Sequence, residues 1–120
     1  MNTLIVGASE HSFRYSYMAA HMLKDHGREF LMIGKQGGSL LDREIMKIRD
    51  FPKLEEIDTI TLYINPRNQK DIYDYLLGLN PRRIIFNPGT ENFEFRAMAE
   101  AQNIEVVEAC TLVMLQTGQY

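Results

Sequence analysis

The chain has 120 residues, of which 45% are apolar and 24% charged, and its formal net charge is -3 at pH 7. These values suit one globular domain with one core, and they argue against a nucleic-acid binder, which usually carries a basic face. The single cysteine, Cys110, excludes an internal disulfide and a cysteine-based zinc site. Because the N-terminus does not resemble a signal peptide and no stretch approaches the roughly 18 apolar residues of a membrane span, we expect a cytoplasmic protein without membrane contact.

Short apolar runs alternate with helical periods in the first half of the chain. Residues 3–8 predict a buried strand, and Ser12 is a candidate N-cap for the helix that follows. The spacing predicts that the packing face of this helix consists of Tyr15, Met18, Ala19, Met22 and Leu23. Residues 29–34 predict a second strand, followed by a glycine-containing loop. Residues 44–57 are the least regular, and we interpret them as a short extended piece, a turn at Pro52 and one helical turn.

The same alternation continues in the second half. Residues 59–65 predict a third strand, and Pro66 suits the first turn of the next helix, where its missing N–H costs nothing. A fourth strand and turn are expected at residues 82–89, a helix at 91–102, a fifth strand at 104–109, and a closing helical turn from Cys110. The predicted apolar face of the helix after Pro66 consists of Ile72, Tyr75, Leu76 and Leu79. That of the helix at residues 91–102 consists of Phe93, Ala97, Met98 and Ala101.

Alternating strands and helices predict right-handed βαβ units. We therefore expect residues 1–120 to form a single Rossmann-like three-layer α/β/α domain with a mostly parallel five-stranded sheet. Ligands of such sheets bind beyond the carboxyl ends of the strands, where the strand order reverses. The expected strand ends are residues 7–9, 34–35, 65–67, 87–92 and 108–111.

The end of the first predicted strand has the features of an anion site. Gly7 permits a tight turn, and the helix that follows would point its N-terminus, with its partial positive charge, at a ligand. Ser9, Ser12 and Ser16 can add hydroxyl donors, and Arg14 can add a bidentate donor for phosphate oxygens. The alternative is that Ser12 only caps the helix and that Arg14 is a solvated surface residue.

The other strand ends narrow the class of ligand. Lys35 stands where an NAD-binding domain usually has an acidic residue that binds the ribose. The lysine counts against NAD as the ligand and indicates a phosphate group instead. The alternative is that Lys35 is an exposed residue of a flexible glycine-rich loop. Arg67 at a helix start opposes the helix dipole, which is easier to understand if an anion approaches. The histidines do not have the spacing of metal ligands, and no catalytic set can be assembled. Cys110 is either a buried thiol or a thiol close to a sulfur of the ligand.

The stretch VGASEHSFRYSY, the glycine-rich loop after the second strand, the Asn-Pro after the third and the cysteine after the fifth resemble stand-alone CoA-binding domain proteins. These are similar to the CoA-binding domain of the succinyl-CoA synthetase alpha subunit and of acetate–CoA ligases. The resemblance implies that the CoA pyrophosphate is held by Gly7, Ala8, Ser9, Arg14 and Ser16. It places Lys35 near the 3′-phosphate or ribose, Asn65, Pro66 and Arg67 beside the adenine and the pantetheine path, and Asn87, Pro88 and Gly89 along the pantetheine arm toward Cys110.

The sequence thus predicts non-catalytic binding of CoA or an acyl-CoA. Related ligases carry a phosphorylated histidine and a second domain, which these 120 residues lack, so we expect no ligase activity. Two alternatives remain: an NAD(P)-type or redox-regulatory domain, and a scaffold subunit that has lost its ligand. A homo-oligomer or a partner protein is compatible with each of them.

Overall fold

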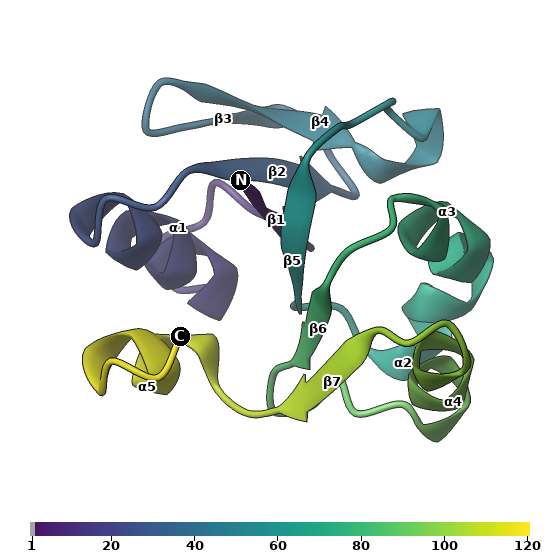
Figure 1. Cartoon of the computed structure of the whole chain (residues 1–120). Helices are drawn as coiled ribbons and strands as arrows, with labels where there is room; N and C mark the ends of the chain where they lie inside the picture. Colours follow the sequence, from purple (N-terminus) through teal and green to yellow (C-terminus); the bar gives the residue numbers. More distant parts are fainter. Residues whose placement is uncertain (1) are drawn as a thin grey trace.

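A computed structural model describes residues 2–120, which form one twisted seven-stranded sheet with helices on both faces (Figure 1). The strands are β1 (Asn2–Val6), β2 (Phe30–Gly34), β3 (Gly38–Leu40), β4 (Arg43–Lys47), β5 (Ile57–Leu62), β6 (Arg83–Phe86) and β7 (Glu105–Glu108). The helices are α1 (Tyr15–Asp25), α2 (Pro66–Gln69), α3 (Tyr73–Gly78), α4 (Phe93–Ala101) and α5 (Thr111–Gln116), with 3-10 turns η1 (Ile48–Asp50) and η2 (Lys70–Ile72).

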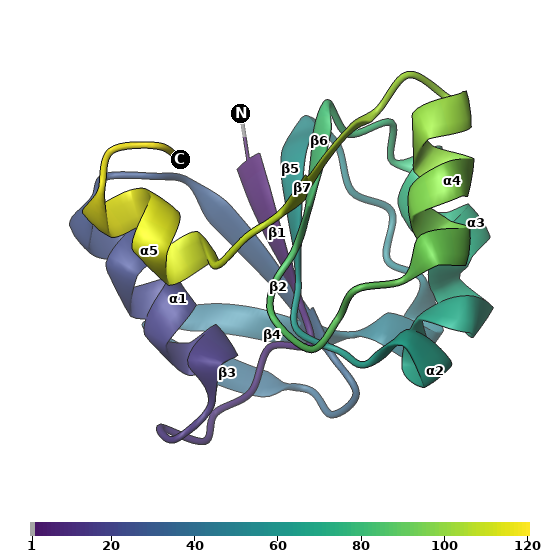
Figure 2. The same ribbon diagram turned by 90° about the horizontal axis from the view of Figure 1, so that it is seen from below.

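Helices α1 and α5 cover one face of the sheet, and α2, α3 and α4 cover the other (Figure 2). The strand order is β3-β4-β2-β1-β5-β6-β7, and every pair is parallel except β3 with β4. The expected Rossmann-like α/β class is therefore confirmed, but the sheet has seven strands and not five.

The strand order reverses between β1 and β5. From β1 the chain moves outward to β2 and β4, and it then returns to pair β5 with the opposite edge of β1. Since Val6 lies opposite both Ile33 and Leu62, these strands end at one level of the sheet. The structure therefore has its topological switch point at the carboxyl ends of β1 and β5, where open α/β sheets bind ligands.

Two apolar cores hold the layers together. The larger core lies under α3 and α4 and includes the fully buried side chains of Leu4, Ile60, Leu62, Ile84, Phe86 and Phe95. The smaller core lies under α1 and includes Ile5, Ala20, Leu23, Phe30 and Met32. Because both faces of the central strands are covered, most residues of β1 and β5 are buried, as is typical of parallel sheets.

The two additional strands come from a hairpin that the sequence did not indicate. Strands β3 and β4 are joined by Leu41 and Asp42, whose φ angles are 56° and 60°. A two-residue hairpin turn of type I′ needs positive φ at both positions and usually has Asn-Gly or Asp-Gly there. Leu-Asp gives no such signal, so the sequence predicts only a loop followed by a short extended piece.

The predicted packing face of α1 is right in part, and that of α4 is largely wrong. In α1 Ala19 and Leu23 are buried as predicted, together with Ser16 and Ala20, whereas Tyr15 is 68% exposed. In α4 the buried residues are Phe95 and Ala99, whereas Phe93 is 89% exposed. In both helices the sequence period was right, but some of the largest apolar side chains face outward. Small residues let α1 approach the sheet closely.

Candidate functional site

A cleft of about 1180 Å³ opens at the switch point, over the carboxyl ends of β1 and β5. It is formed by the loop after β1, the start of α1, the loop after β2, the segment around η1, and the loops after β5 and β6. The predicted site residues that line it are Gly7, Ala8, Ser9, Arg14, Ser16, Lys35, Asn65, Pro88 and Gly89. The fold thus brings together residues from four separate strand ends.

The turn after β1 requires glycine at two places. Gly7 has φ 98°, and a Cβ there would lie 2.7 Å from Ile64 Cγ2. A Cβ on Gly34 would lie only 2.4 Å from the carbonyl oxygen of Ala8. The N–H groups of Gly7 and Ala8 both donate to the Ile33 carbonyl, at 2.9 Å each. The backbone of this turn is therefore held tightly across the end of β2, at the floor of the cleft.

Helix α1 begins at the cleft without a capping side chain. Its N-cap is Arg14, which has an extended backbone and makes no side-chain cap hydrogen bond, so the expectation that Ser12 caps this helix is wrong. The serine hydroxyl nearest the turn belongs to Ser9, and its Oγ accepts from the His11 N–H at 3.1 Å. The first turn of α1 contains no acidic residue that would neutralise its partial positive charge. This helix start can therefore receive an anion.

The Ser16 side chain is the feature of the cleft that bears most directly on the kind of ligand it can bind. It lines the cleft, its side chain is 3% exposed, and its Oγ has no hydrogen-bond partner. A buried hydroxyl without a partner costs about 1 to 3 kcal/mol. Buried polar groups are normally paired, so an unpaired one at the start of α1 points to a missing acceptor.

The charged side chains around the cleft are mostly unpaired. Arg14 and Lys35 are exposed, and the ion pairs formed within residues 2–120 involve only Arg82 and Arg96 as cations. Glu10 also lines the cleft, but its Oε2 accepts from the Ser39 N–H at 2.8 Å and so ties the first loop to the β3–β4 hairpin. The two cations thus remain free to meet an anionic ligand.

The loop after β5 contributes one of its three predicted residues to the cleft. Asn65 lines it and also caps α2, since its Oδ1 accepts from the Asn68 N–H at 3.0 Å. Pro66 occupies the first position of α2, as expected. Pro66 and Arg67 lie in α2 and are not part of the cleft lining.

Asn87, at the end of β6, is 2% exposed and does not line the cleft. Its amide donates to Thr61 Oγ1 at 2.7 Å and to the Leu62 carbonyl at 2.8 Å. Its Oδ1 accepts from the Thr111 N–H at 2.8 Å. Since both ends of the amide are used, Asn87 joins β5, β6 and the start of α5. Its neighbours Pro88 and Gly89 reach the cleft instead.

Cys110 and Tyr63 lie on the side of the sheet that α5 covers. Cys110 is the half-buried N-cap of α5 and is not part of the cleft lining. Tyr63 does line the cleft, and burial raises the pKa of its phenol to about 12. Tyr63 is therefore a neutral phenol at physiological pH.

Sequence reasoning missed several cleft residues in the irregular segment after β4. Arg49 and Phe51 both line the cleft, and Phe51 has the left-handed φ of 44°. The Phe51 ring packs against Tyr75 with a centroid distance of 5.3 Å, and the Tyr75 hydroxyl donates to the Pro52 carbonyl. Contacts with α3 therefore shape this segment, and a local sequence pattern does not reveal them.

Two further properties concern the part of the chain that the structure describes. No group of three or more His, Cys, Asp or Glu side chains lies together as a metal site requires. No described helix has both the length and the apolar character needed to cross a membrane.

The fold and the position of the cleft define a Rossmann-like α/β domain with its candidate site at the switch point. The chain belongs to the CoA binding domain family, whose model matches residues 1–116. No match was found among curated proteins.

Solved structures agree with this assignment of the fold. A crystal structure of an uncharacterized protein matches with 48% sequence identity to this chain and a TM-score of 0.95, and the match covers 99% of this chain and 97% of that one. A protein from Thermus thermophilus is 21% identical, with a TM-score of 0.83 and coverage of 99% and 90%. A hypothetical protein from Pyrococcus horikoshii OT3 is 19% identical, with a TM-score of 0.84 and coverage of 96% and 81%. The latter two share the fold with this chain.

Proposed function

We propose that the protein binds CoA or an acyl-CoA in the cleft and carries out no chemistry on it. The pyrophosphate lies over the turn after β1 and the start of α1. Its oxygens accept from the backbone at the helix start and from the side chains of Ser9, Arg14 and Ser16. Gly7 and Ala8 let the ligand approach the backbone closely.

The observation that carries this proposal is the unpaired Ser16 hydroxyl. It is buried at the start of a helix whose first turn has no acidic side chain, in a cleft at the switch point. A phosphate oxygen supplies the acceptor that this hydroxyl lacks. Arg14, which is exposed and makes no ion pair within the described residues, adds a charge-assisted donor at the same helix start.

The rest of the ligand extends along the cleft on both sides of the pyrophosphate. Lys35 borders the ribose end, whereas Asn65, Pro88 and Gly89 border the path of the pantetheine arm. The proposal gives Pro66, Arg67, Asn87 and Cys110 no direct contact in the cleft. Among the hydrogen bonds of the described residues, no cleft carboxylate or imidazole pairs with a hydroxyl or thiol side chain as a base pairs with a nucleophile.

Isothermal titration calorimetry with CoA, acetyl-CoA and NADPH tests the proposal on the wild-type chain. We expect heat of binding and a raised melting temperature with CoA or acetyl-CoA, and a smaller stabilisation with NADPH. Absence of heat and of any melting shift at millimolar CoA contradicts the proposal. Preferential stabilisation by NADPH favours the dinucleotide-binding alternative.

Replacing Arg14 with Ala tests the pyrophosphate assignment. Loss of a charge-assisted hydrogen bond weakens CoA binding by about tenfold. The fold stays intact because the Arg14 side chain is exposed and makes no cap hydrogen bond. The matched control is Lys24→Ala, which removes an exposed cation from the last turn of the same helix. Equal CoA affinity in both variants rules out the role of Arg14.

A further inference from the structure

The Tyr63 phenol is a second buried hydroxyl of the cleft without a hydrogen-bond partner. Tyr63 directly follows β5 and lines the cleft together with Ser16. The hydroxyl oxygens of both side chains are buried and unpaired. A buried tyrosine hydroxyl normally has a partner, because leaving it without one costs free energy. The proposed position of the pyrophosphate accounts for Ser16 and does not account for Tyr63.

Contacts with the turn after β1 fix the position of Tyr63. Its N–H donates to the Val6 carbonyl at 2.8 Å, and a Cβ on Gly7 would lie only 3.0 Å from the Tyr63 carbonyl carbon. The Tyr63 side chain packs against the smaller apolar core under α1. The phenol is therefore held beside the turn, and an acceptor for its proton has to come from a ligand.

The neighbouring hydroxyls are already engaged. Thr61 Oγ1 and Thr111 Oγ1 share a hydrogen bond of 2.8 Å, and Thr61 Oγ1 also accepts from Asn87 Nδ2 at 2.7 Å. Burial raises the pKa of Tyr63 to about 12, although the Thr61 and Thr111 hydroxyls act in the opposite direction. The phenol thus stays neutral at physiological pH and keeps its proton for donation.

The surroundings of the phenol favour an uncharged acceptor. The titratable side chains that influence the pKa of Tyr63 are those of Cys110 and Tyr120, and neither is a cation. None of the cation–π contacts formed within residues 2–120 involves the Tyr63 ring. An anion buried here would lose its hydration without gaining a counter-charge, whereas a carbonyl oxygen needs only a donor.

Tyr63 lies between the two ends of the path that the arm of the ligand would take. The strand order β1-β5-β6 puts the end of β5 between the turn after β1 and the loop after β6. A ligand that leaves the start of α1 therefore passes Tyr63 before it reaches Pro88 and Gly89, which also line the cleft. The pantetheine arm offers amide carbonyls along this path, and an acyl group adds a thioester carbonyl.

We propose that the Tyr63 hydroxyl donates a hydrogen bond to a carbonyl oxygen of the acyl-pantetheine arm. This inference rests on the proposed function. The acceptor is either an amide carbonyl of the arm or the thioester carbonyl of a bound acyl group. Tyr63 thereby makes the cleft selective for ligands that carry the arm over a nucleotide that has only the phosphates.

Calorimetric titrations of CoA, acetyl-CoA and adenosine 3′,5′-bisphosphate into the wild type and Tyr63→Phe test this inference. The bisphosphate lacks the arm and with it every carbonyl group. Phenylalanine keeps the ring and its packing and removes only the hydroxyl. We expect the affinity for acetyl-CoA to fall about tenfold, because a buried hydrogen bond to the ligand is lost, and the affinity for the bisphosphate to stay unchanged.

The titration with CoA distinguishes the two sources of the carbonyl. A loss of CoA affinity equal to that of acetyl-CoA assigns the hydrogen bond to an amide of the arm. A loss confined to acetyl-CoA assigns it to the thioester.

Tyr17→Phe is the matched control, because Tyr17 is half-buried against the same core and does not line the cleft. It should keep all wild-type affinities. The melting temperature of ligand-free Tyr63→Phe should equal or exceed that of the wild type, because an unpaired buried hydroxyl is removed. Unchanged affinity of Tyr63→Phe for CoA and acetyl-CoA, or an equal loss for all three ligands, overturns the inference and leaves the proposed function standing. Failure of the wild type to bind CoA and acetyl-CoA overturns the proposed function and the inference with it.

Discussion

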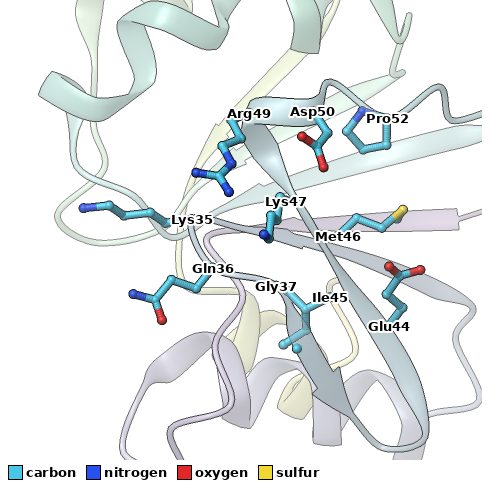
Figure 3. A pocket seen from close by; sticks show the side chains of 11 residues that line it. Lys35, Gln36, Gly37, Glu44, Ile45, Met46, Lys47, Arg49, Asp50 and Pro52 are labelled. Atoms are coloured by element: carbon cyan, nitrogen blue, oxygen red, sulfur yellow. The ribbon is translucent and has the colours of Figure 1, made fainter.

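The two ends of the cleft offer anions different kinds of partner. At the start of α1 the donors are backbone N–H groups, the buried Ser16 hydroxyl and the exposed Arg14 guanidinium. At the other end the cleft shares Lys35 and Arg49 with a second hollow of about 820 Å³, here called the β4 hollow, which Lys47 also lines (Figure 3). The donors there are exposed ammonium and guanidinium groups. The first end thus combines fixed donors with one mobile cation, whereas the second offers mobile cations.

This difference has energetic consequences. Backbone groups and a buried serine lose little freedom when a ligand arrives, so their geometry contributes directly to affinity. Lysine and arginine each carry about 2 kcal/mol of rotamer entropy, part of which is lost on binding. Solvent and salt also screen exposed charges. Changes of shape should therefore matter more at the α1 end than at the β4 hollow, where changes of charge and ionic strength should dominate.

The largest effect is expected from Gly34→Ala, which tests how rigid the floor of the α1 end is. The added Cβ would lie 2.4 Å from the Ala8 carbonyl oxygen, so the turn after β1 must shift. Overpacking of this kind lowers the free energy of unfolding by about 3 kcal/mol. Thermal or urea denaturation measures the loss, and CoA titration should show weaker binding as well.

Gly78→Ala is the control for this substitution. A Cβ on Gly78 meets no atom within 4 Å, and the residue ends α3 without a positive φ. Its stability should be equal to that of the wild type or slightly higher, since alanine favours a helix over glycine. Equal stability of the two alanine variants would mean that the turn adapts easily.

Much of the fold follows from local pattern. The strands ending near Gly7, Gly34 and Asn65 are short apolar runs bounded by small residues or proline, and these signals place the carboxyl edge of the sheet correctly. The Pro66 helix start is also predicted from a single residue with restricted φ. Backbone chemistry alone is enough at these positions.

The parts that were missed depend on tertiary contacts. In the β3–β4 hairpin Leu41 and Asp42 have positive φ angles that their residue types do not predict. Strand β4 is held in the sheet by its pairing with β2. Tyr15 and Phe93 are large and apolar yet exposed, so periodicity placed each of them wrongly on a packing face. Composition cannot show which apolar side chains the sheet leaves uncovered.

The candidate site likewise has residues that the sequence predicts and residues that only tertiary contacts bring to the cleft. The residues after β1 could be predicted because a glycine turn followed by Ser and Arg has a mechanism for holding phosphate. Arg49 and Phe51 could not be predicted, because the left-handed conformation of Phe51 and its packing on Tyr75 bring this segment to the cleft. Asn87 was expected at the ligand, but three buried hydrogen bonds, to β5 and to the start of α5, engage its amide.

A smaller effect is expected from salt. Raising NaCl from about 0.1 M to about 1 M shortens the Debye length from about 10 Å to about 3 Å. CoA affinity should fall several-fold, because salt screens the exposed cations that line the cleft. Titrations of CoA at the two salt concentrations measure this loss. A CoA affinity that does not change with salt would mean that the exposed cations contribute little to binding.

The central claim is that the Ser16 hydroxyl lacks its acceptor until a phosphate arrives, and Ser16→Ala tests it most directly. The free protein should be more stable by about 1 kcal/mol, because an unpaired buried hydroxyl is removed, while CoA affinity falls about tenfold. Ser12→Ala, an exposed change in the same segment outside the cleft lining, should alter neither quantity. Denaturation without ligand and calorimetry with CoA, made on the wild type and both variants, give the answer. A Ser16→Ala protein that is less stable than the wild type and binds CoA with unchanged affinity would contradict the claim.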